Sequence, residues 1–225
     1  MAHAFVLIPG AGGRAWYWHL IAPRLIERGH AVSAVELPAD DDTKGLPDYA
    51  KAVMDAVGAA RDVVIVAASL GTFTAPLVMD ALGAIAVMLV NPMIPLPGET
   101  PGGWWANTGA ADARRANAAR LGYPEEFNPG TYMFHDVPPE VLATVTPKGE
   151  QSQRPFHDPC TFTSWPRLVT VITGRDDRFF PAEFQQRLAQ ERLGVEPVVV
   201  PGGHLVALSK PDELTAAILT ATHGI

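Results

Sequence analysis

The sequence predicts a doubly wound α/β fold, built on a mainly parallel β-sheet with helices on both faces. Short apolar runs rich in Val, Ile and Ala recur along the chain, and segments with helical spacing separate them. Runs without polar alternation are typical of strands that are buried on both faces. Strands that alternate with helices indicate a parallel sheet, whose ligands bind at the carboxyl ends of the strands.

The order of these runs defines the expected elements. The expected strands are Ala4–Ile8, Ala31–Val35, Val63–Val66, Ile85–Val90, Leu168–Ile172 and Pro197–Val200. The expected helices lie near Ala15–Arg28, Asp48–Gly58, Leu70–Leu82, Pro181–Arg192 and Pro211–Thr222. Pro181 and Pro211 suit the first turn of a helix, and Gly29 suits a position just past the end of one.

Residues 92–165 interrupt this alternation. Pro and Gly are frequent there, and the segment holds about half of the aromatic residues in about a third of the chain. We expect a single domain over residues 1–225, with residues 92–165 as a cap inserted over the sheet. Either tryptophan of the Trp104–Trp105 pair could instead pack this cap onto the core. The candidates for lining a substrate pocket are Trp104, Trp105, Phe134 and His135.

The strongest local signal is Ser69, which lies between a predicted strand and a predicted helix. The residues two positions away on either side, Ala67 and Gly71, are both small. So tight a strand–turn–helix connection forces the serine backbone into a strained conformation and exposes its Oγ, as in a nucleophile elbow. The pattern alone fits a serine that caps an ordinary helix equally well, so the interpretation depends on its partners.

Two polar segments supply those partners. A serine nucleophile needs a base, and the base needs a third group that orients it. His204 follows the last predicted strand, and Asp176 and Asp177 follow the strand before it, so all three belong at carboxyl ends of the sheet. We predict that Ser69 is the nucleophile, His204 the base and Asp177 the orienting acid, with Asp176 as the alternative acid.

Acyl transfer also needs donors for the developing oxyanion. We expect the backbone N–H of Leu70, which follows the nucleophile, and that of Ala11, in the glycine-rich loop after the first strand. A plain tight turn is the alternative reading of that loop. Phosphate binding is not indicated, because the loop contains neither Gly-x-Gly-x-x-Gly nor a Walker pattern.

These motifs together resemble the α/β-hydrolases, most closely the branch of the plant methylesterases and hydroxynitrile lyases. The resemblance rests on Ile8-Pro9-Gly10-Ala11, Trp16-Tyr17-Trp18, the Ser69 elbow and Asp177–Gln185, and it covers nearly the whole core. It implies a Ser-His-Asp triad and an ester-like substrate beneath a cap. It also favours Asp177 over Asp176, because Asp177 precedes Pro181 by four residues, as in relatives.

The departures from this family bear on the reaction. Pro9 replaces the usual histidine before Gly10. Leu205 and Ala11 stand where the lyases have a lysine and a threonine, which favours hydrolysis, and Ser69 excludes the dehalogenases and epoxide hydrolases, which use an aspartate. We expect hydrolysis of a small, mainly apolar ester or thioester through an acyl-enzyme. The alternatives are a cofactor-free lyase or C–C bond hydrolase with the same triad, and a hydrolase-fold ligand receptor.

Composition limits the other partners. The formal net charge of −7, without a cluster of Lys and Arg, disfavours nucleic acid and anionic membranes as partners, so a small-molecule substrate is expected. The first residues do not form a signal peptide and no apolar run is long enough to span a bilayer, so a cytoplasmic protein is expected. Cys160 is the only cysteine, which excludes an intramolecular disulfide. No residue cluster has metal-ligand spacing, and the expected reaction needs no cofactor.

Overall fold

A parallel sheet forms the centre of the computed structural model, which describes residues 2–145, 149–223 and 225. The sheet has six strands in the order β2-β1-β3-β4-β5-β6, and every neighbouring pair is parallel. The strands are β1 (Ala4–Ile8), β2 (Ala31–Ala34), β3 (Val63–Ala68), β4 (Ala86–Val90), β5 (Val169–Gly174) and β6 (Val198–Val200). The predicted parallel α/β architecture is confirmed.

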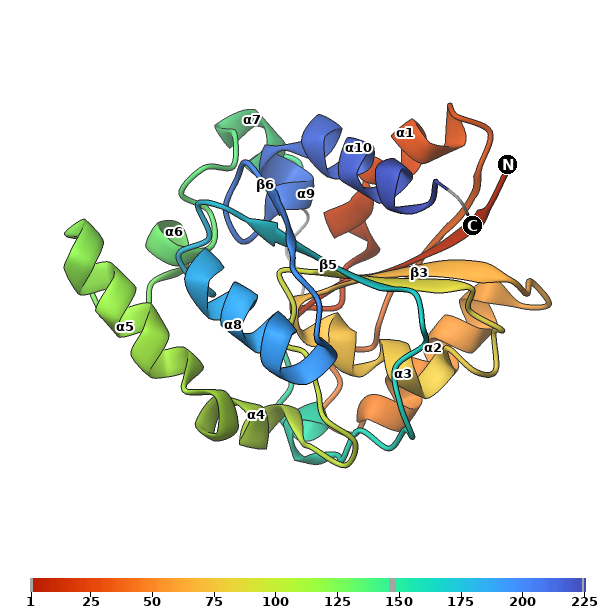
Figure 1. Cartoon of the computed structure of the whole chain (residues 1–225), viewed down its shortest axis with the longest axis horizontal. Coiled ribbons are helices and arrows are strands. Elements are labelled where there is room, and N and C mark those ends of the chain that lie inside the picture. The colour runs from red at the N-terminus through yellow and green to blue at the C-terminus, as the bar shows by residue number, and fades with distance from the viewer. Residues whose placement is uncertain (1, 146–148, 224) are drawn as a thin grey trace.

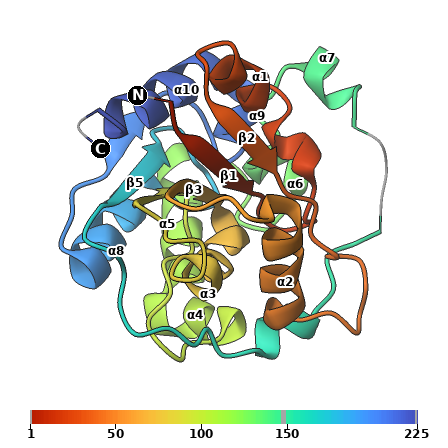
Figure 2. The ribbon, with the colours of Figure 1, turned by 90° about the vertical axis from the view of Figure 1, so that its right-hand side faces the viewer.

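Helices cover both faces of this sheet (Figures 1 and 2). One face carries α1 (Ile21–Ile26), α9 (Val206–Ser209) and α10 (Pro211–Ala221), and the opposite face carries α2 (Leu46–Val57), α3 (Ala75–Val78) and α8 (Ala182–Leu193). Successive strand residues point to alternate faces. Phe5 and Leu7 of β1 therefore pack towards α1 and α10, whereas Val6 and Ile8 pack towards α2, α3 and α8. The two apolar cores explain why the central strands show no polar alternation.

The two edge strands differ from the expectation. In β2 every residue is at least partly exposed, and in β6 Val198 and Val199 are 43% and 56% exposed. Burial on both faces, which we predicted for all of the apolar runs, is therefore wrong for these two strands. An edge strand has a neighbour on one side only, and its outer residues are covered less completely.

Two predicted helices are each broken into two shorter ones, and prolines explain both breaks. The segment Ala15–Arg28 forms a 3₁₀ helix, η1 (Ala15–Trp18), and then α1. The segment Leu70–Leu82 forms a 3₁₀ helix, η2 (Ser69–Phe73), and then α3. A proline inside a helix lacks an N–H group and clashes with the carbonyl four residues earlier, so it is tolerated only in the first turn. Pro23 and Pro76 accordingly lie in the first turns of α1 and α3, which begin anew just before them.

The predicted first-turn prolines and the glycine stop have mixed outcomes. Pro211 is the first residue of α10, as predicted, whereas Pro181 immediately precedes α8 and is its N-cap. Gly29 follows α1 with φ of +84°, a left-handed conformation that suits the end of a helix. Among the described residues, no helix has the length and apolar composition that crossing a membrane would require.

The segment between β4 and β5, which includes residues 92–165, is mainly helical. It contains α4 (Pro101–Thr108), α5 (Ala110–Leu121), α6 (Pro129–Tyr132), α7 (Pro139–Leu142) and the 3₁₀ helix η3 (Arg154–His157). In Figure 1, α5 and α6 lie on the side of the molecule towards which the arrow of β5 points. This placement supports our proposal that residues 92–165 cap the carboxyl ends of the strands.

A buried ion pair fastens the start of this segment to the core. Arg192, at the end of α8, contacts both carboxylate oxygens of Glu99, and the two side chains are only 7% and 5% exposed. Asn107 Nδ2 and the Leu96 N–H donate to the same carboxylate at 2.8 and 3.1 Å. Burial raises the pKa of Glu99, but the hydrogen bonds from Arg192, Asn107 and Leu96 outweigh it and hold the pKa below its ordinary value of 4.5.

We predict that Glu99→Gln lowers the free energy of unfolding by about 3 to 5 kcal/mol, because it leaves the Arg192 charge buried without its partner. Urea denaturation at pH 7 measures this loss. Since the folded-state pKa of Glu99 is lowered, its stabilising contribution is present above pH 4.5 and is lost as the pH falls through the lowered pKa. The difference between wild type and variant should shrink accordingly in acid. Glu183→Gln, on the exposed face of α8, is the matched control and should change stability little. Equal losses in the two variants would contradict the prediction.

Candidate active site

The carboxyl ends of β1 and β3 meet at the point where the strand order reverses. From β1 the chain continues to β2 on one side of it, and then to β3 and β4 on the other side. Loops that leave the sheet at such a point run in opposite directions and open a crevice, in which α/β proteins bind their ligands. Ser69 follows β3 directly, and the loop Gly10–Gly13 follows β1. The predicted nucleophile and the predicted oxyanion loop are therefore neighbours.

The backbone at Ser69 is strained, as the elbow pattern predicted. Its φ is +47°, in the left-handed region that residues other than glycine rarely adopt. The surrounding loops are packed so closely that side chains are excluded. A Cβ atom at Gly71 would lie 2.2 Å from the carbonyl oxygen of Pro9, and one at Gly10 would lie 2.9 Å from the Cβ of Ser69. The two glycines thus allow the β1 loop to lie against the turn that presents Ser69.

The structure brings Ser69, His204 and Asp177 into one hydrogen-bonded chain. His204 Nε2 is 3.1 Å from Ser69 Oγ, and His204 Nδ1 is 2.8 Å from Asp177 Oδ2. The side chains of His204 and Asp177 are only 1% and 0% exposed. An ionised carboxylate can only accept hydrogen bonds, so the proton of the neutral imidazole lies on Nδ1. Nε2 is then free to accept the hydroxyl proton of Ser69.

The two neighbouring aspartates have different partners. The second oxygen of Asp177, Oδ1, accepts the N–H groups of Phe179 and Phe180 at 2.8 and 2.9 Å, so the carboxylate is held in place by the turn that follows it. Asp176 pairs instead with Arg175 at 3.1 Å, and accepts the N–H of Gly202 at 3.2 Å. The hydrogen bond from Arg175 lowers the pKa of Asp176. Asp176 therefore connects the β5 loop to the β6 loop, and Asp177 alone contacts the imidazole.

Two phenylalanines fix the plane of the imidazole. The rings of Phe179 and Phe180 meet that of His204 edge to face, with centroids 5.0 and 5.1 Å away. Such edge-to-face contacts are favourable because the positive edge of one ring faces the negative face of the other. Together with the Asp177 hydrogen bond, they leave the imidazole little freedom to turn away from Ser69.

Sequence reasoning missed Asn91, the residue that ties together the loops of the acid and the base. Its amide nitrogen donates to the carbonyl oxygens of Gly203 and His204 at 3.1 and 2.8 Å. Its amide oxygen accepts the N–H of Gly174 at 2.7 Å. Asn91 is 1% exposed and has φ of +42°, a conformation that asparagine tolerates better than most residues. The only sequence signal was a polar residue directly after β4.

The two expected oxyanion donors belong to the turn of Ser69 and to the β1 loop that lies against it. Leu70 is the second residue of η2, and the first N–H groups of a helix have no acceptor within it. Ala11 lies at an exposed turn of the β1 loop, and among the described residues its N–H has no hydrogen-bond acceptor. Both N–H groups are therefore available to a ligand at Ser69, although their role in catalysis stays a prediction.

The four pocket candidates lie in different surroundings. Trp104 is fully buried, donates its indole N–H to Ile94 O at 3.1 Å and packs on Phe180. This position fits the alternative in which it packs the cap onto the core. Trp105 is partly buried and contacts Phe179 and Phe180, one ring away from His204. Phe134 is 40% exposed.

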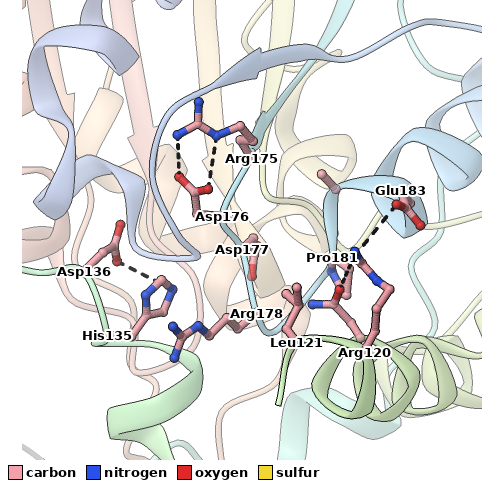
Figure 3. Close-up of a pocket in the computed structure, with 12 residues that line it drawn as sticks. Arg120, Leu121, His135, Asp136, Arg175, Asp176, Asp177, Arg178, Pro181 and Glu183 are labelled. Atoms are coloured by element: carbon pink, nitrogen blue, oxygen red, sulfur yellow. Dashed lines mark hydrogen bonds and ion pairs between the residues drawn. The ribbon is translucent and has the colours of Figure 1, made fainter. Parts of the chain in front are cut away.

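His135 lines a cavity of about 580 Å³ that reaches Asp177 (Figure 3). Asp136, Asp176, Asp177 and Arg178 line the same cavity, but Ser69 and His204 are not among its lining residues. Burial lowers the pKa of His135, although nearby Asp136 acts in the opposite direction. Asp136 also accepts the N–H of Gly203, the residue before His204, at 2.6 Å. Among the described residues, no group of His, Cys, Asp and Glu is arranged to hold a metal ion.

Comparisons with known proteins show related sequences and the same fold. The Alpha/beta hydrolase family matches residues 5–217. Methylesterase 3 from Arabidopsis thaliana is 33% identical, over 95% of this chain and 94% of that protein, and Salicylic acid-binding protein 2 from Nicotiana tabacum is 27% identical, over 97% and 96%. A solved pyrethroid hydrolase from Sphingobium faniae JZ-2 superposes with a TM-score of 0.77 at 21% identity, covering 100% of this chain and 98% of that one. The resemblance to methylesterases seen in the sequence is confirmed.

The different partners of the two aspartates lead to a prediction. Asp177→Asn should slow the reaction of Ser69 with a fluorophosphonate probe by a factor on the order of 10⁴, because an amide can hold the imidazole in the wrong tautomer. Asp176→Asn should slow it far less, since Asp176 does not touch His204. Labelling rates followed by intact mass measure both effects, and denaturation midpoints show whether each variant is folded. If Asp176→Asn is the more damaging change, the two assignments are reversed.

Proposed function

The chain belongs to the alpha/beta hydrolase family, and we propose that it cleaves a small, mainly apolar ester or thioester through an acyl-enzyme on Ser69. The observation that carries this proposal is the unbroken hydrogen-bonded chain from Ser69 through His204 to the buried Asp177. The full-length likeness to a methylesterase supports an ester as the substrate.

In the first half of the proposed reaction, Ser69 attacks the carbonyl carbon of the substrate. His204 Nε2, 3.1 Å from Oγ, takes the hydroxyl proton as the bond forms. The imidazolium that results is stabilised by Asp177, which accepts a hydrogen bond from its Nδ1–H at 2.8 Å. The carbonyl oxygen becomes negatively charged, and the N–H groups of Ala11 and Leu70 donate to it.

The second half returns the enzyme to its starting state. Collapse of the tetrahedral intermediate breaks the bond to the leaving group, which takes the proton from His204 Nε2. Water then takes the place of the leaving group, gives a proton to His204 and attacks the acyl carbon. The bond between Ser69 Oγ and the acyl carbon then breaks, and Oγ takes back a proton from His204. The protein groups needed for both halves are the same, so no metal or organic cofactor takes part in the proposed steps.

Apolar surroundings support an apolar substrate and hydrolysis. Phe179 packs on His204, and Trp105 packs on Phe179, so apolar rings extend from the base into the segment 92–165. Pockets for small molecules are lined mainly by such groups. Leu205, next to the base, and Ala11 carry neither an amine nor a hydroxyl. They offer no group that would stabilise a cyanide leaving group, which disfavours the lyase alternative.

The first functional prediction concerns the nucleophile. Ser69→Ala should abolish hydrolysis of short p-nitrophenyl esters and labelling by a fluorophosphonate, while the melting temperature stays close to that of wild type, because one small side chain replaces another. Intact mass of the wild type, quenched during turnover, should show the acyl adduct on Ser69. Labelling at a different serine, or an active Ser69→Ala variant, would rule out the proposed reaction. Labelling without turnover of any ester would favour a receptor.

A second prediction separates the two tryptophans. Trp105→Ala should change the ratio of kcat/KM between an ester with an aromatic acyl group and the acetyl ester of the same alcohol by at least about tenfold. The reason is that burying an apolar ring against the substrate is worth about 1.5 to 3 kcal/mol. Trp104→Phe is the control. It should lower the melting temperature and leave the ratio unchanged, since Trp104 is fully buried and bonded to Ile94. If neither ratio changes, these rings of the segment 92–165 do not determine the substrate preference.

A further inference from the structure

The loop that presents Ala11 is a tight turn with a defined geometry. Gly13 N–H donates to Gly10 O at 3.1 Å, so residues Gly10 to Gly13 form a β-turn. The φ of Gly12, at the third position, is +84°, and Ala11 has no positive φ. That combination defines a type II turn, which needs glycine at its third position. A Cβ at Gly10 would touch Ser69, so the start of the turn lies against the nucleophile.

This geometry decides where the Ala11 N–H points. In a trans peptide the C=O and N–H groups point in opposite directions. Gly10 O points into the turn towards Gly13, so the N–H of the same peptide, that of Ala11, points out of it. The bond from Gly13 sets this direction, which is the same in a type I and a type II turn, because these differ by a flip of the central peptide between Ala11 and Gly12. Where the Ala11 N–H lies relative to Ser69 therefore depends on the position of the whole turn. Gly12 adopts either sign of φ at little cost, so its own backbone does not hold the turn in one form.

The contact that holds this turn in place comes from the side chain of Gln151. Its Oε1 accepts the N–H of Gly12 at 2.8 Å. Its Nε2 donates to the hydroxyl oxygen of Tyr49 in α2 at 3.0 Å and to Ser152 O at 2.9 Å. The following N–H, that of Ser152, donates to Ala39 O at 2.7 Å. The core therefore holds the nitrogen of the carboxamide, and the oxygen of the carboxamide holds the turn.

Displacing the turn would be costly in this setting. The N–H of Gly12 would lose its acceptor on Gln151, and Oε1 would lose its donor. Gln151 cannot follow the turn by swinging its carboxamide, because Nε2 is already committed to Tyr49 and Ser152. Breaking these bonds leaves polar groups unpaired, at about 1 to 3 kcal/mol for each buried group.

We propose that Gln151 is a positioning residue for the oxyanion site: its carboxamide bonds to the Gly12 N–H and holds the Gly10–Gly13 turn, with its outward-pointing Ala11 N–H, in place beside Ser69. The inference rests on the proposed function, since it concerns the oxyanion of that reaction. Gln151 lies 139 residues from Gly12 in the sequence, within the segment 92–165. The proposed cap thus completes the catalytic loop of the core, in addition to any contact that it makes with substrate.

The test compares Gln151→Met with Gln153→Met. Both make the same substitution in the same segment, but Gln153 is exposed. Gln151→Met should lower kcat for a p-nitrophenyl ester by about tenfold, a part of the 10²- to 10³-fold loss that follows complete removal of an oxyanion donor. KM should change less than about twofold, because the ground-state carbonyl makes little use of the donor. Gln153→Met should behave as wild type.

A second readout separates positioning from general damage. A trifluoromethyl ketone adds Ser69 Oγ to its carbonyl carbon and yields an oxyanion at the same place, so its inhibition constant should rise by the same factor as kcat/KM falls. Binding of the carboxylic acid product should not change. Tyr49→Phe removes the anchor of Nε2 while keeping the bond to Gly12, and should give a smaller effect in the same direction. It also serves as the test if Gln151→Met does not fold.

The outcomes are distinguishable. Wild-type kcat and inhibitor affinity in a folded Gln151→Met variant, or equal losses for ketone and product, would overturn the role of Gln151 while leaving the serine hydrolase intact. If Gln151→Met does not fold, an unchanged kcat in Tyr49→Phe would overturn it as well. Failure of the wild type to hydrolyse any ester or to react at Ser69 would instead overturn the proposed function itself.

Discussion

The left-handed backbone of Ser69 is the constraint on which the rest of the site depends. A non-glycine residue at φ of +47° is held there only if its surroundings leave no relaxed alternative. Those surroundings are the β1 loop, which reaches the turn because neither Gly10 nor Gly71 has a side chain. The strain is therefore maintained by contacts between β1 and β3, neighbours in the middle of the sheet. Ser69 and the turn of Ala11 are consequently fixed relative to each other before any substrate arrives.

The other half of the site is built on the same principle of close backbone approach. A Cβ at Gly174 would lie 2.5 Å from Gly202 O, so the loops that carry Asp177 and His204 touch through backbone atoms. Asn91 crosses between these loops and satisfies three backbone groups that would otherwise be buried without partners. Buried polar groups of this kind are costly unless each is paired. The acid and the base are thus held by polar bonds, whereas the nucleophile is held by steric exclusion.

Sequence reasoning identified features of the fold and site that depend on local pattern, and it missed features that depend on long-range contacts. The strands, the elbow at Ser69 and the order Ser, Asp, His follow from apolar periodicity and from position after strands, and the structure places them accordingly. The breaks before Pro23 and Pro76 were readable from the local rule for proline and were overlooked. Asn91 had only its place directly after β4 as a signal, and Gln151 had none, because an amide in a loop has no signature until the fold supplies its partners. Partial exposure of β2 and β6 likewise follows from strand order, which the sequence does not state.

The segment 92–165 is more closely tied to the core than a detachable lid would be. Glu99 pairs with Arg192 where the segment begins, and near its end the buried carboxylate of Asp158 accepts the N–H of Leu46 at 2.8 Å, at the start of α2. An anion at the start of a helix is favoured by the helix dipole, and Gly45 leaves room for it, since a Cβ there would overlap Asp158. Between these attachments Gln151 reaches the catalytic turn. Opening this segment as a rigid unit would break a buried ion pair, so any motion that admits substrate is more easily confined to its middle, around α5 and α6. Substrate preference can then change there while the attachments that hold the catalytic loops stay in place.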